Sequence, residues 1–280
     1  MKHRIAIQGI EGSFHDIAAH RYFDNEEVEL VCCETFEQVF SEMSRDPQLM
    51  AMVAIENTIA GSLLHNYELL RDSGVTIVGE HKLHICHSIM CLPEDDWDDL
   101  KEVNSHPVAL MQCRDFLNKH RGLKVVEVAD TAGAAADISR GHLRGHAAIC
   151  HKDAAEIYGM KVLQEGIETN KHNFTRFLVL ANQQMAIGMR NLQEVNKSSL
   201  VFTLPHEEGS LSAILSVLSF YKLNLTKIQS LPIIGKEWQY MFYIDLSFSD
   251  YTRYRQAINA ISPLTSDLKL LGEYREKNGE

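Results

Sequence analysis

The chain has 280 residues, of which 45% are hydrophobic and 23% are charged, so it is neither disordered nor fibrous and is long enough for two domains. Its formal net charge is −11 and its lysines and arginines are scattered, which excludes a nucleic-acid partner because such partners need clustered cations. No stretch approaches about 18 uninterrupted apolar residues, and the start MKHRIAIQG runs from basic residues straight into a strand pattern. We therefore expect neither a membrane span nor a signal peptide, and six cysteines without a CxxC pair indicate a reducing cytoplasm.

Residues 1–181 alternate short apolar runs with helical patterns, for example MVAI before SLLHNYELLRDSG and VVEVAD before TAGAAADISRG. Strands that alternate with helices at this spacing predict βαβ units and a mostly parallel sheet. Polar residues collect over residues 182–198 and predict a linker. From residue 199 to 280 the pattern is strand, helix, two strands, helix and strand, which is the βαββαβ order of a ferredoxin-like domain.

Hydroxyl and amide side chains stand where several helices of the first domain should begin. Such side chains cap the free N–H groups of a first helical turn, and the same turn can bind an anion. Because ligands of open α/β sheets bind at the carboxyl ends of the strands, these residues are either N-caps alone or parts of an anion site. A carboxylate directly after MVAI, Glu56, needs a partner or a function if it is buried. The capping candidates are Ser13, Asn57, Thr58, Ser62, Ser105 and Thr131.

Ser105 and Gln112 are seven residues apart, which corresponds to two helical turns. If the helix in HPVALMQCRDFL extends back to Ser105, both side chains lie on one face. A capping serine and a buried glutamine would explain the same pattern.

Five motifs in this order and spacing resemble those of the prephenate dehydratases. The resemblance covers nearly the whole chain and includes a C-terminal ACT regulatory domain. It implies a carbon–oxygen lyase that decarboxylates and dehydrates prephenate to phenylpyruvate in phenylalanine biosynthesis, without a metal or an organic cofactor. The motifs are GIEGSFHDIAA (9–19), AIENTIAGS (54–62), SHPVALMQC (105–113), AAICHKDAAEIYG (147–159) and NFTRFLVL (173–180).

The resemblance also implies the fold class. Residues 1–181 would form an α/β catalytic domain with two lobes, similar to type II periplasmic binding proteins, with the site in the cleft between the lobes. The chain would cross between the lobes near residues 80–90 and 160–175. After the linker at 182–198, residues 199–280 would form the α+β ACT domain.

Carried over motif by motif, the resemblance places catalytic residues at Thr175, Glu56, Asn57, Ser105 and Gln112. Thr175 would donate a hydrogen bond to the departing hydroxyl, and Glu56 would orient the groups that bind the carboxylates and the hydroxyl. Arg176 either sharpens the acidity of Thr175 or points elsewhere, because neighbours on a strand face opposite sides. The expected substrate-binding residues are Ser13, Thr58, Thr131, Asn173, Arg176 and Phe177.

Three positions depart from the usual motifs of the family. Ser13 stands where the family commonly has a threonine and keeps a hydroxyl. His15 stands where the family commonly has the serine of Gly-Thr-Phe-Ser, and Asp130 stands where it has the serine of Ser-Thr-Ala. Asp130 adds a negative charge close to a site that should receive a dianion. It therefore either points away or is offset by local pairing.

The implied ACT domain would bind L-phenylalanine as an effector in a homodimer or homotetramer. A domain kept for oligomerisation alone is the alternative, because the family's Glu-Ser-Arg-Pro element is Gln-Ser-Leu-Pro here. The expected effector residues are Gly209, Ser210, Leu211, Asn224, Leu225, Gln229 and Ser230.

Three other interpretations stay open. Arogenate dehydratases act on the amino rather than the keto side chain, and a non-catalytic ligand sensor would need the cleft without a donor at a leaving group. A metal site is the third, because four possible ligands crowd into HKLHICHSIM, although alternate residues of a strand face opposite sides. These ligands are His81, His84, Cys86 and His87.

Overall fold

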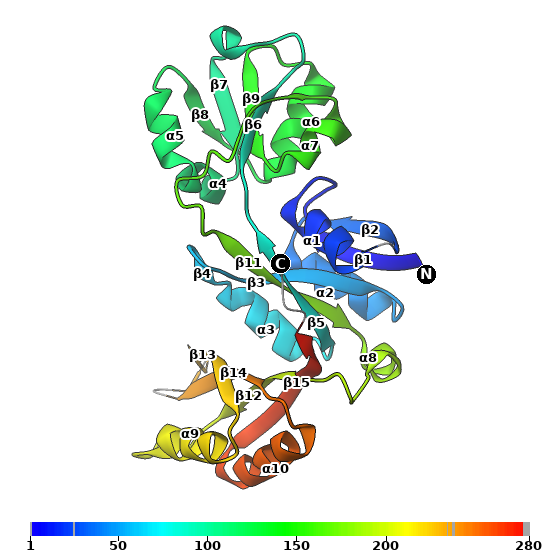
Figure 1. Ribbon diagram of the computed structural model, residues 1–280, viewed down its shortest axis with the longest axis vertical. Coiled ribbons are helices and arrows are strands. Elements are labelled where there is room, and N and C mark those ends of the chain that lie inside the picture. Colours follow the sequence, from blue (N-terminus) through cyan, green and yellow to red (C-terminus); the bar gives the residue numbers. More distant parts are fainter. Residues whose placement is uncertain (1, 25, 234, 237–238, 277–280) are drawn as a thin grey trace. The chain divides into compact units, whose positions relative to one another are not determined.

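The computed structural model describes residues 2–24, 26–233, 235–236 and 239–276 (Figure 1). It divides into two compact units, of which unit 1 comprises Met1–Leu63 and Lys82–Phe177, and unit 2 comprises Leu64–His81 and Leu178–Glu280. Strands β5 (Thr76–His84) and β11 (Phe174–Ala181) each contribute residues to both units.

The first sheet of unit 1 contains β1 (Lys2–Gln8), β2 (Glu27–Cys33), β3 (Met50–Asn57), the short β4 (Gly61–Ser62) and the start of β11, with α1 (Phe14–Tyr22) and α2 (Phe36–Arg45) between its strands. β1 pairs in parallel with both β2 and β3. Every residue of β3 except Glu56 is buried, as the near-continuous apolar run predicts for a strand covered on both faces.

The second sheet of unit 1 has the order β10-β6-β9-β7-β8, and segments 85–87 and 166–173 join it to the first sheet. β7 is parallel to β8 and β9, but β6 is antiparallel to β9 and β10. The predicted, mostly parallel sheet is therefore two sheets, of which the second is mixed. Its elements are β6 (Ser88–Cys91), η1 (Trp97–Asp99), β7 (Glu102–Ser105), α4 (Pro107–Gln112), α5 (Arg114–Lys119), β8 (Lys124–Glu127), α6 (Thr131–Gly141), β9 (His146–Cys150), α7 (Asp153–Tyr158) and β10 (Lys161–Glu165).

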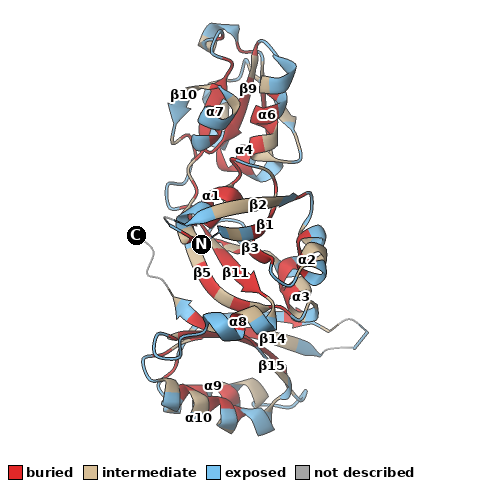
Figure 2. Ribbon diagram, turned by 90° about the vertical axis from the view of Figure 1, so that its right-hand side faces the viewer, coloured by how far each residue is buried: buried red, intermediate tan, exposed pale blue. Residues whose placement is uncertain are grey.

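Unit 2 has the βαββαβ order that the sequence predicts, and its sheet has the strand order β13-β14-β12-β15-β5. α9 and α10 cover one face of this sheet, and their apolar sides meet it in a single core (Figure 2). No helix in the described part of the chain is both long and apolar enough to cross a membrane. The elements are α3 (Leu64–Asp72), α8 (Gln183–Met189), β12 (Lys197–Thr203), α9 (Ser210–Phe220), β13 (Asn224–Pro232), β14 (Tyr240–Ser247), α10 (Tyr251–Ile261), η2 (Ser262–Leu264) and β15 (Ser266–Glu276).

The segment predicted as a linker, residues 182–198, contains helix α8 and the first residues of β12. Asn182 caps α8, because its side chain accepts from the Met185 N–H at 2.8 Å. Of the residues within α8, only Ala186 is buried. A helix that buries so little leaves no apolar period in the sequence, which is why composition alone predicted a linker.

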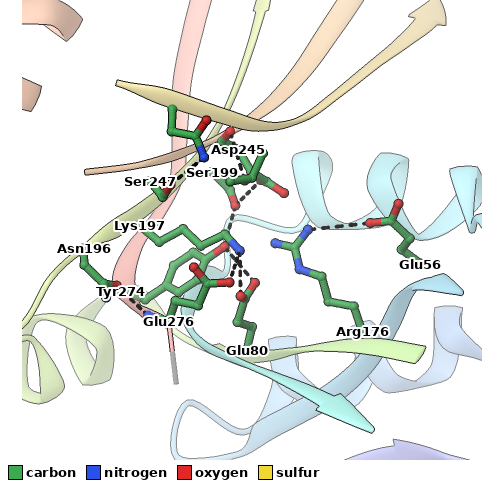
Figure 3. Close-up of polar contacts among 12 residues, drawn as sticks. Glu56, Glu80, Arg176, Asn196, Lys197, Ser199, Asp245, Ser247, Tyr274 and Glu276 are labelled. Carbon is green, nitrogen blue, oxygen red and sulfur yellow. Dashed lines mark hydrogen bonds and ion pairs between the residues drawn. The ribbon is translucent and has the colours of Figure 1, made fainter. Parts of the chain in front are cut away.

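A buried ionic network lies between β5, β12 and β15 in unit 2 (Figure 3). Lys197 Nζ donates to Glu80 Oε1 at 2.6 Å and to Glu276 Oε1 at 3.1 Å. The Lys197 and Glu80 side chains are only 3% and 1% exposed. The buried Lys197 ammonium group therefore neutralises the buried Glu80 carboxylate, because an unpaired buried charge would destabilise the fold.

Gly272 permits the close approach of β15 to β5. A Cβ atom at this position would lie 2.3 Å from the Ile77 carbonyl oxygen, which is part of the backbone and cannot move aside cheaply. We expect Gly272→Ala to lower the free energy of unfolding by about 1–3 kcal/mol in urea titrations. Gly188→Ala is the matched control, because a Cβ there meets nothing within 4 Å, and equal effects of the two changes would contradict this packing argument.

Candidate functional site

Unit 1 contains a cavity of about 380 Å³, within the range of small-molecule sites. Its walls come from the ends of β1, β3 and β11, from α1 and α4, and from the start of α6. Apolar side chains such as Phe14, Phe36 and Phe177 form much of the surface, and polar groups are set among them. The polar lining residues are Gln8, Ser13, His15, Asn57, His87, His106, Gln112, Asp130, Thr131 and Thr175.

Thr175 and Asn57 form the hydrogen-bonded pair at one wall of the cavity. Thr175 is the second residue of β11 and Asn57 is the last residue of β3, and both are buried. Asn57 Nδ2 donates to Thr175 Oγ1 at 2.9 Å. Among the described residues, no hydrogen bond is donated by the Thr175 hydroxyl, which leaves its hydrogen for an acceptor in the cavity.

The Asn57 side chain is fixed on both sides of its amide. Nδ2 also donates to Asn173 Oδ1 at 2.8 Å, while Oδ1 accepts from the backbone N–H groups of Ile59 at 2.9 Å and Ala60 at 2.8 Å. These contacts also fix which end of the amide faces Thr175. The orientation of the Thr175 hydroxyl is therefore set by the turn that follows β3.

Gln112 and His87 form a second polar pair in the wall. The His87 Nε2 atom lies 2.8 Å from Gln112 Oε1, and the His87 backbone N–H donates to the buried Glu168 carboxylate at 2.9 Å. Burial lowers the pKa of His87, so the ring is neutral at pH 7. With Nε2–H donating to Oε1, the Gln112 amide keeps its N–H groups for another acceptor.

His15 is a third polar group of the wall. Its Nε2 atom accepts from the Ala54 backbone N–H at 3.3 Å, and its ring meets that of Phe177 edge-on with centroids 5.0 Å apart. Burial lowers the pKa of His15 to about 4. The imidazole is therefore a neutral part of the cavity wall at pH 7.

We expect an NMR titration of His15 to show a midpoint near pH 4. Between this value and the unfolded value of about 6.5, the folded protein binds fewer protons than the unfolded chain. The free energy of unfolding therefore falls as the pH is lowered through this window. His15→Ser should remove that part of the acid sensitivity, and a wild-type midpoint near 6.5 would contradict the assignment.

Two helices begin at the cavity with capped N-termini. Ser13 Oγ accepts from the Asp16 N–H at 3.3 Å at the start of α1. Asp130 Oδ1 accepts from the Gly133 N–H at 2.6 Å at the start of α6, where Thr131 is the first helical residue. Burial raises the pKa of Asp130. Asp130 lines the cavity, so it does not point away from it.

Five of the residues proposed from the sequence do not line the cavity. Arg176 faces Glu56, with Nη1 3.9 Å from Oε2 (Figure 3). Neither of the two lines the cavity. The Ser105 hydroxyl donates to the Ile149 carbonyl at 2.5 Å. The set outside the lining is Glu56, Thr58, Ser105, Asn173 and Arg176, whereas Ser13, Asn57, Gln112, Thr131, Thr175 and Phe177 lie together in it.

The suggestion that Ser105 and Gln112 share a helical face is wrong. Ser105 is the last residue of β7, and α4 begins only at Pro107 with His106 as its N-cap. Pro107 explains the boundary, because proline disfavours a helical conformation in the residue before it. Only Gln112 reaches the cavity.

Five polar lining residues were not assigned to the site from the sequence, namely Gln8, His15, His87, His106 and Asp130. His15 and Asp130 carried a signal, since both replace a serine of the motifs that the chain resembles. His87 and His106 carried none, because a lone histidine is compatible with many surroundings.

Three of the possible metal ligands in the segment HKLHICHSIM have other partners. His84 Nε2 lies 2.6 Å from the Lys171 carbonyl oxygen, Cys86 Sγ lies 3.2 Å from His84 Nδ1, and His87 turns to Gln112. Within the described ranges, no group of three or more His, Cys, Asp or Glu side chains is arranged to hold a metal ion.

Unit 2 has a smaller cavity of about 140 Å³ between the loop after β12, the start of α9 and β14. Ser210 and Leu211 line it together with Pro205, His206 and Tyr240. The other residues expected to bind an effector do not line it, namely Gly209, Asn224, Leu225, Gln229 and Ser230.

A family model described as prephenate dehydratase matches residues 5–185. The chain is 36% identical over 281 residues to arogenate dehydratase/prephenate dehydratase 2, chloroplastic, from Arabidopsis thaliana, and the match covers 97% of this chain and 72% of that protein.

Solved structures also resemble this chain. GqqA, described as a novel type of quorum quenching acylase, superposes with a TM-score of 0.86 at 26% identity over 98% of each chain. A prephenate dehydratase from Arthrobacter aurescens in complex with L-Phe superposes with a TM-score of 0.85 over 99% of this chain and 91% of that one. At 23% identity, the second likeness concerns the fold alone.

Proposed function

Because the chain belongs to the prephenate dehydratase family, we propose that it removes CO₂ and hydroxide from the ring of prephenate, giving phenylpyruvate, or of arogenate, giving phenylalanine. In this reaction the bond between the ring and its carboxylate breaks, and its electron pair enters the ring. The bond to the ring hydroxyl breaks at the opposite carbon, and the ring becomes aromatic. Aromatisation supplies the driving force, so the protein must position the ring and stabilise the departing hydroxide.

One observation carries this proposal: Thr175 lines the cavity and Asn57 donates to its oxygen at 2.9 Å, which leaves the hydroxyl hydrogen for an acceptor in the cavity. A donor that is held in place before the reaction stabilises charge as it develops on the leaving oxygen. Because binding sites also use hydroxyl donors, product formation rather than ligand binding distinguishes this role from a non-catalytic sensor.

The binding of the carboxylates is assigned to neutral donors. Ser13, the first turn of α1 and the amide of Gln112 offer N–H and O–H groups around the cavity. In this proposal four residues that do not line the cavity fix the strand ends that carry the donors, namely Glu56, Thr58, Ser105 and Asn173. Arg176 belongs to the same support through its ion pair with Glu56.

The test is to incubate the pure full chain with prephenate and, separately, with arogenate, and to follow phenylpyruvate and phenylalanine. We expect product from at least one substrate without added cofactor. No product from either would overturn the enzyme assignment and leave a ligand sensor.

The likeness to GqqA raises amide hydrolysis as a second candidate. An acylase that used Thr175 as a nucleophile would need a base within hydrogen-bonding reach of its hydroxyl. Among the described residues, its hydrogen-bond partner is the Asn57 amide, which is not a base. The geometry therefore favours dehydration over acyl transfer.

We further propose that residues 199–280 form an ACT domain that binds L-phenylalanine, and that the protein is a homodimer or homotetramer. The βαββαβ order and the cavity beside Ser210 and Leu211 support this role. Calorimetric titration with phenylalanine, tyrosine and tryptophan tests it, and no heat from any of them would leave a domain for oligomerisation alone. Light scattering gives the oligomeric state.

Six free cysteines support a reducing compartment such as the cytoplasm.

A further inference from the structure

Asp130 places a carboxylate in the wall of the cavity. It follows β8, has an extended backbone and caps α6 through Oδ1, which accepts from the Gly133 N–H at 2.6 Å. Its other oxygen, Oδ2, lies toward Gly9, because a Cβ atom on Gly9 would be 3.1 Å from it. The same Cβ would be 3.2 Å from Ser13 Oγ. Asp130 and Ser13 therefore approach the same corner of the cavity.

The carboxylate occupies the position that a substrate anion would otherwise take. The free N–H groups at a helix N-terminus attract anions, but at α6 the Gly133 N–H is already bonded to Asp130. A substrate carboxylate at this wall would meet a negative charge in place of a donor.

Among the described lining residues, only His106 offsets this charge, by lowering the pKa of Asp130, whereas burial raises that pKa more. Among the described residues that line the cavity, none is a lysine or an arginine. Burial lowers the pKa values of His15 and His87, so both rings are neutral at pH 7. Of the other lining residues only His106 can carry a positive charge, and its Nδ1 atom accepts from the Val108 N–H at 3.2 Å.

We propose that Asp130 is a specificity-determining residue that makes this site prefer a substrate with an ammonium group on its side chain, which is arogenate rather than prephenate. The inference rests on the proposed function. Arogenate carries an ammonium group where prephenate has a keto oxygen, and the ammonium N–H groups can donate to the Asp130 carboxylate. The keto oxygen can only accept, so it would face another acceptor.

The net charges of the two substrates also favour arogenate. Arogenate enters with one negative charge and prephenate with two, while the wall contributes the negative charge of Asp130. An ammonium beside Asp130 favours the ionised carboxylate and so opposes the effect of burial on its pKa. A site built to bind a substrate N–H group can reject the analogue that lacks it by about 10⁴–10⁵-fold in the strongest cases.

The experiment measures kcat/KM for both substrates with the full-length wild type, Asp130→Asn and Asp130→Ser. Asparagine and serine keep a capping side chain but remove the charge. We expect the wild type to favour arogenate by about 10²-fold, and each variant to reduce this ratio by about tenfold or more. Asp250→Asn is the matched control, because Asp250 caps α10 in the same way without lining the cavity, and its ratio should equal that of the wild type.

The outcomes separate the two claims. Two results overturn the specificity role and leave the dehydratase assignment standing. The first is turnover in which the ratio of kcat/KM for arogenate to that for prephenate is the same in the wild type and in both Asp130 variants. The second is a wild-type preference for prephenate. No turnover of either substrate by the wild type overturns both. Circular dichroism spectra equal to that of the wild type establish that the variants are folded.

Discussion

Replacing Thr175 with alanine is expected to lower kcat by about 10²–10³-fold, the cost of one preorganised donor at a developing oxyanion. Asn57 donates to the Thr175 oxygen, so the hydroxyl hydrogen is the part of this side chain that can reach the leaving group. The effect should appear in kcat more than in KM, because the interaction strengthens as hydroxide departs. Steady-state kinetics with the better of the two substrates provides the measurement.

Two further variants separate the hydroxyl from the shape of the side chain. Thr175→Ser keeps the hydroxyl and should retain far more activity than Thr175→Ala. Thr175→Val keeps the shape without the donor and should be as poor as alanine. Equal rates in all three variants would exclude a donor role for Thr175.

Replacing Lys197 with methionine should lower the free energy of unfolding by about 3–5 kcal/mol, because it leaves the buried Glu80 carboxylate without its cation. The double variant Lys197→Met with Glu80→Met should recover most of this loss, since an apolar pair replaces a buried ion pair at little cost. Urea unfolding of the full chain measures both effects.

A matched control uses the same substitution in an exposed pair. Lys152 lies 3.3 Å from Glu165, and their side chains are 53% and 60% exposed. Lys152→Met should therefore change the free energy of unfolding by less than about 1 kcal/mol. A loss at Lys197 no larger than that at Lys152 would mean that the buried network does not stabilise unit 2.

The sequence predicted the order of elements well where the apolar period is strong. In residues 199–280 the predicted order of strand, helix, two strands, helix and strand matches β12, α9, β13, β14, α10 and β15. The spacing of apolar residues does not predict an element that buries few side chains, as in α8. The apolar pattern also cannot distinguish one parallel sheet from two sheets. The antiparallel pairing of β6 with β10 depends on contacts between residues that are far apart in the chain.

The sequence motifs indicate which segments contribute to the candidate site, but not which of their side chains line the cavity. Strand alternation indicates that Thr175 and Arg176 face opposite sides, yet it does not tell which of them meets the cavity. The structure places Thr175 in the wall and pairs Arg176 with Glu56. Ser105 has a suitable hydroxyl in a matching motif, but its contact with the Ile149 carbonyl arises from the pairing of two strands and could not be read from the sequence.

The most direct test is the incubation of the pure 280-residue chain with prephenate and with arogenate, each also with Thr175→Ala. Our account predicts that the wild type forms an aromatic product with loss of CO₂, that arogenate is the better substrate, and that Thr175→Ala is slower by about 10²–10³-fold. Absence of aromatic product from both substrates with the wild type would contradict it.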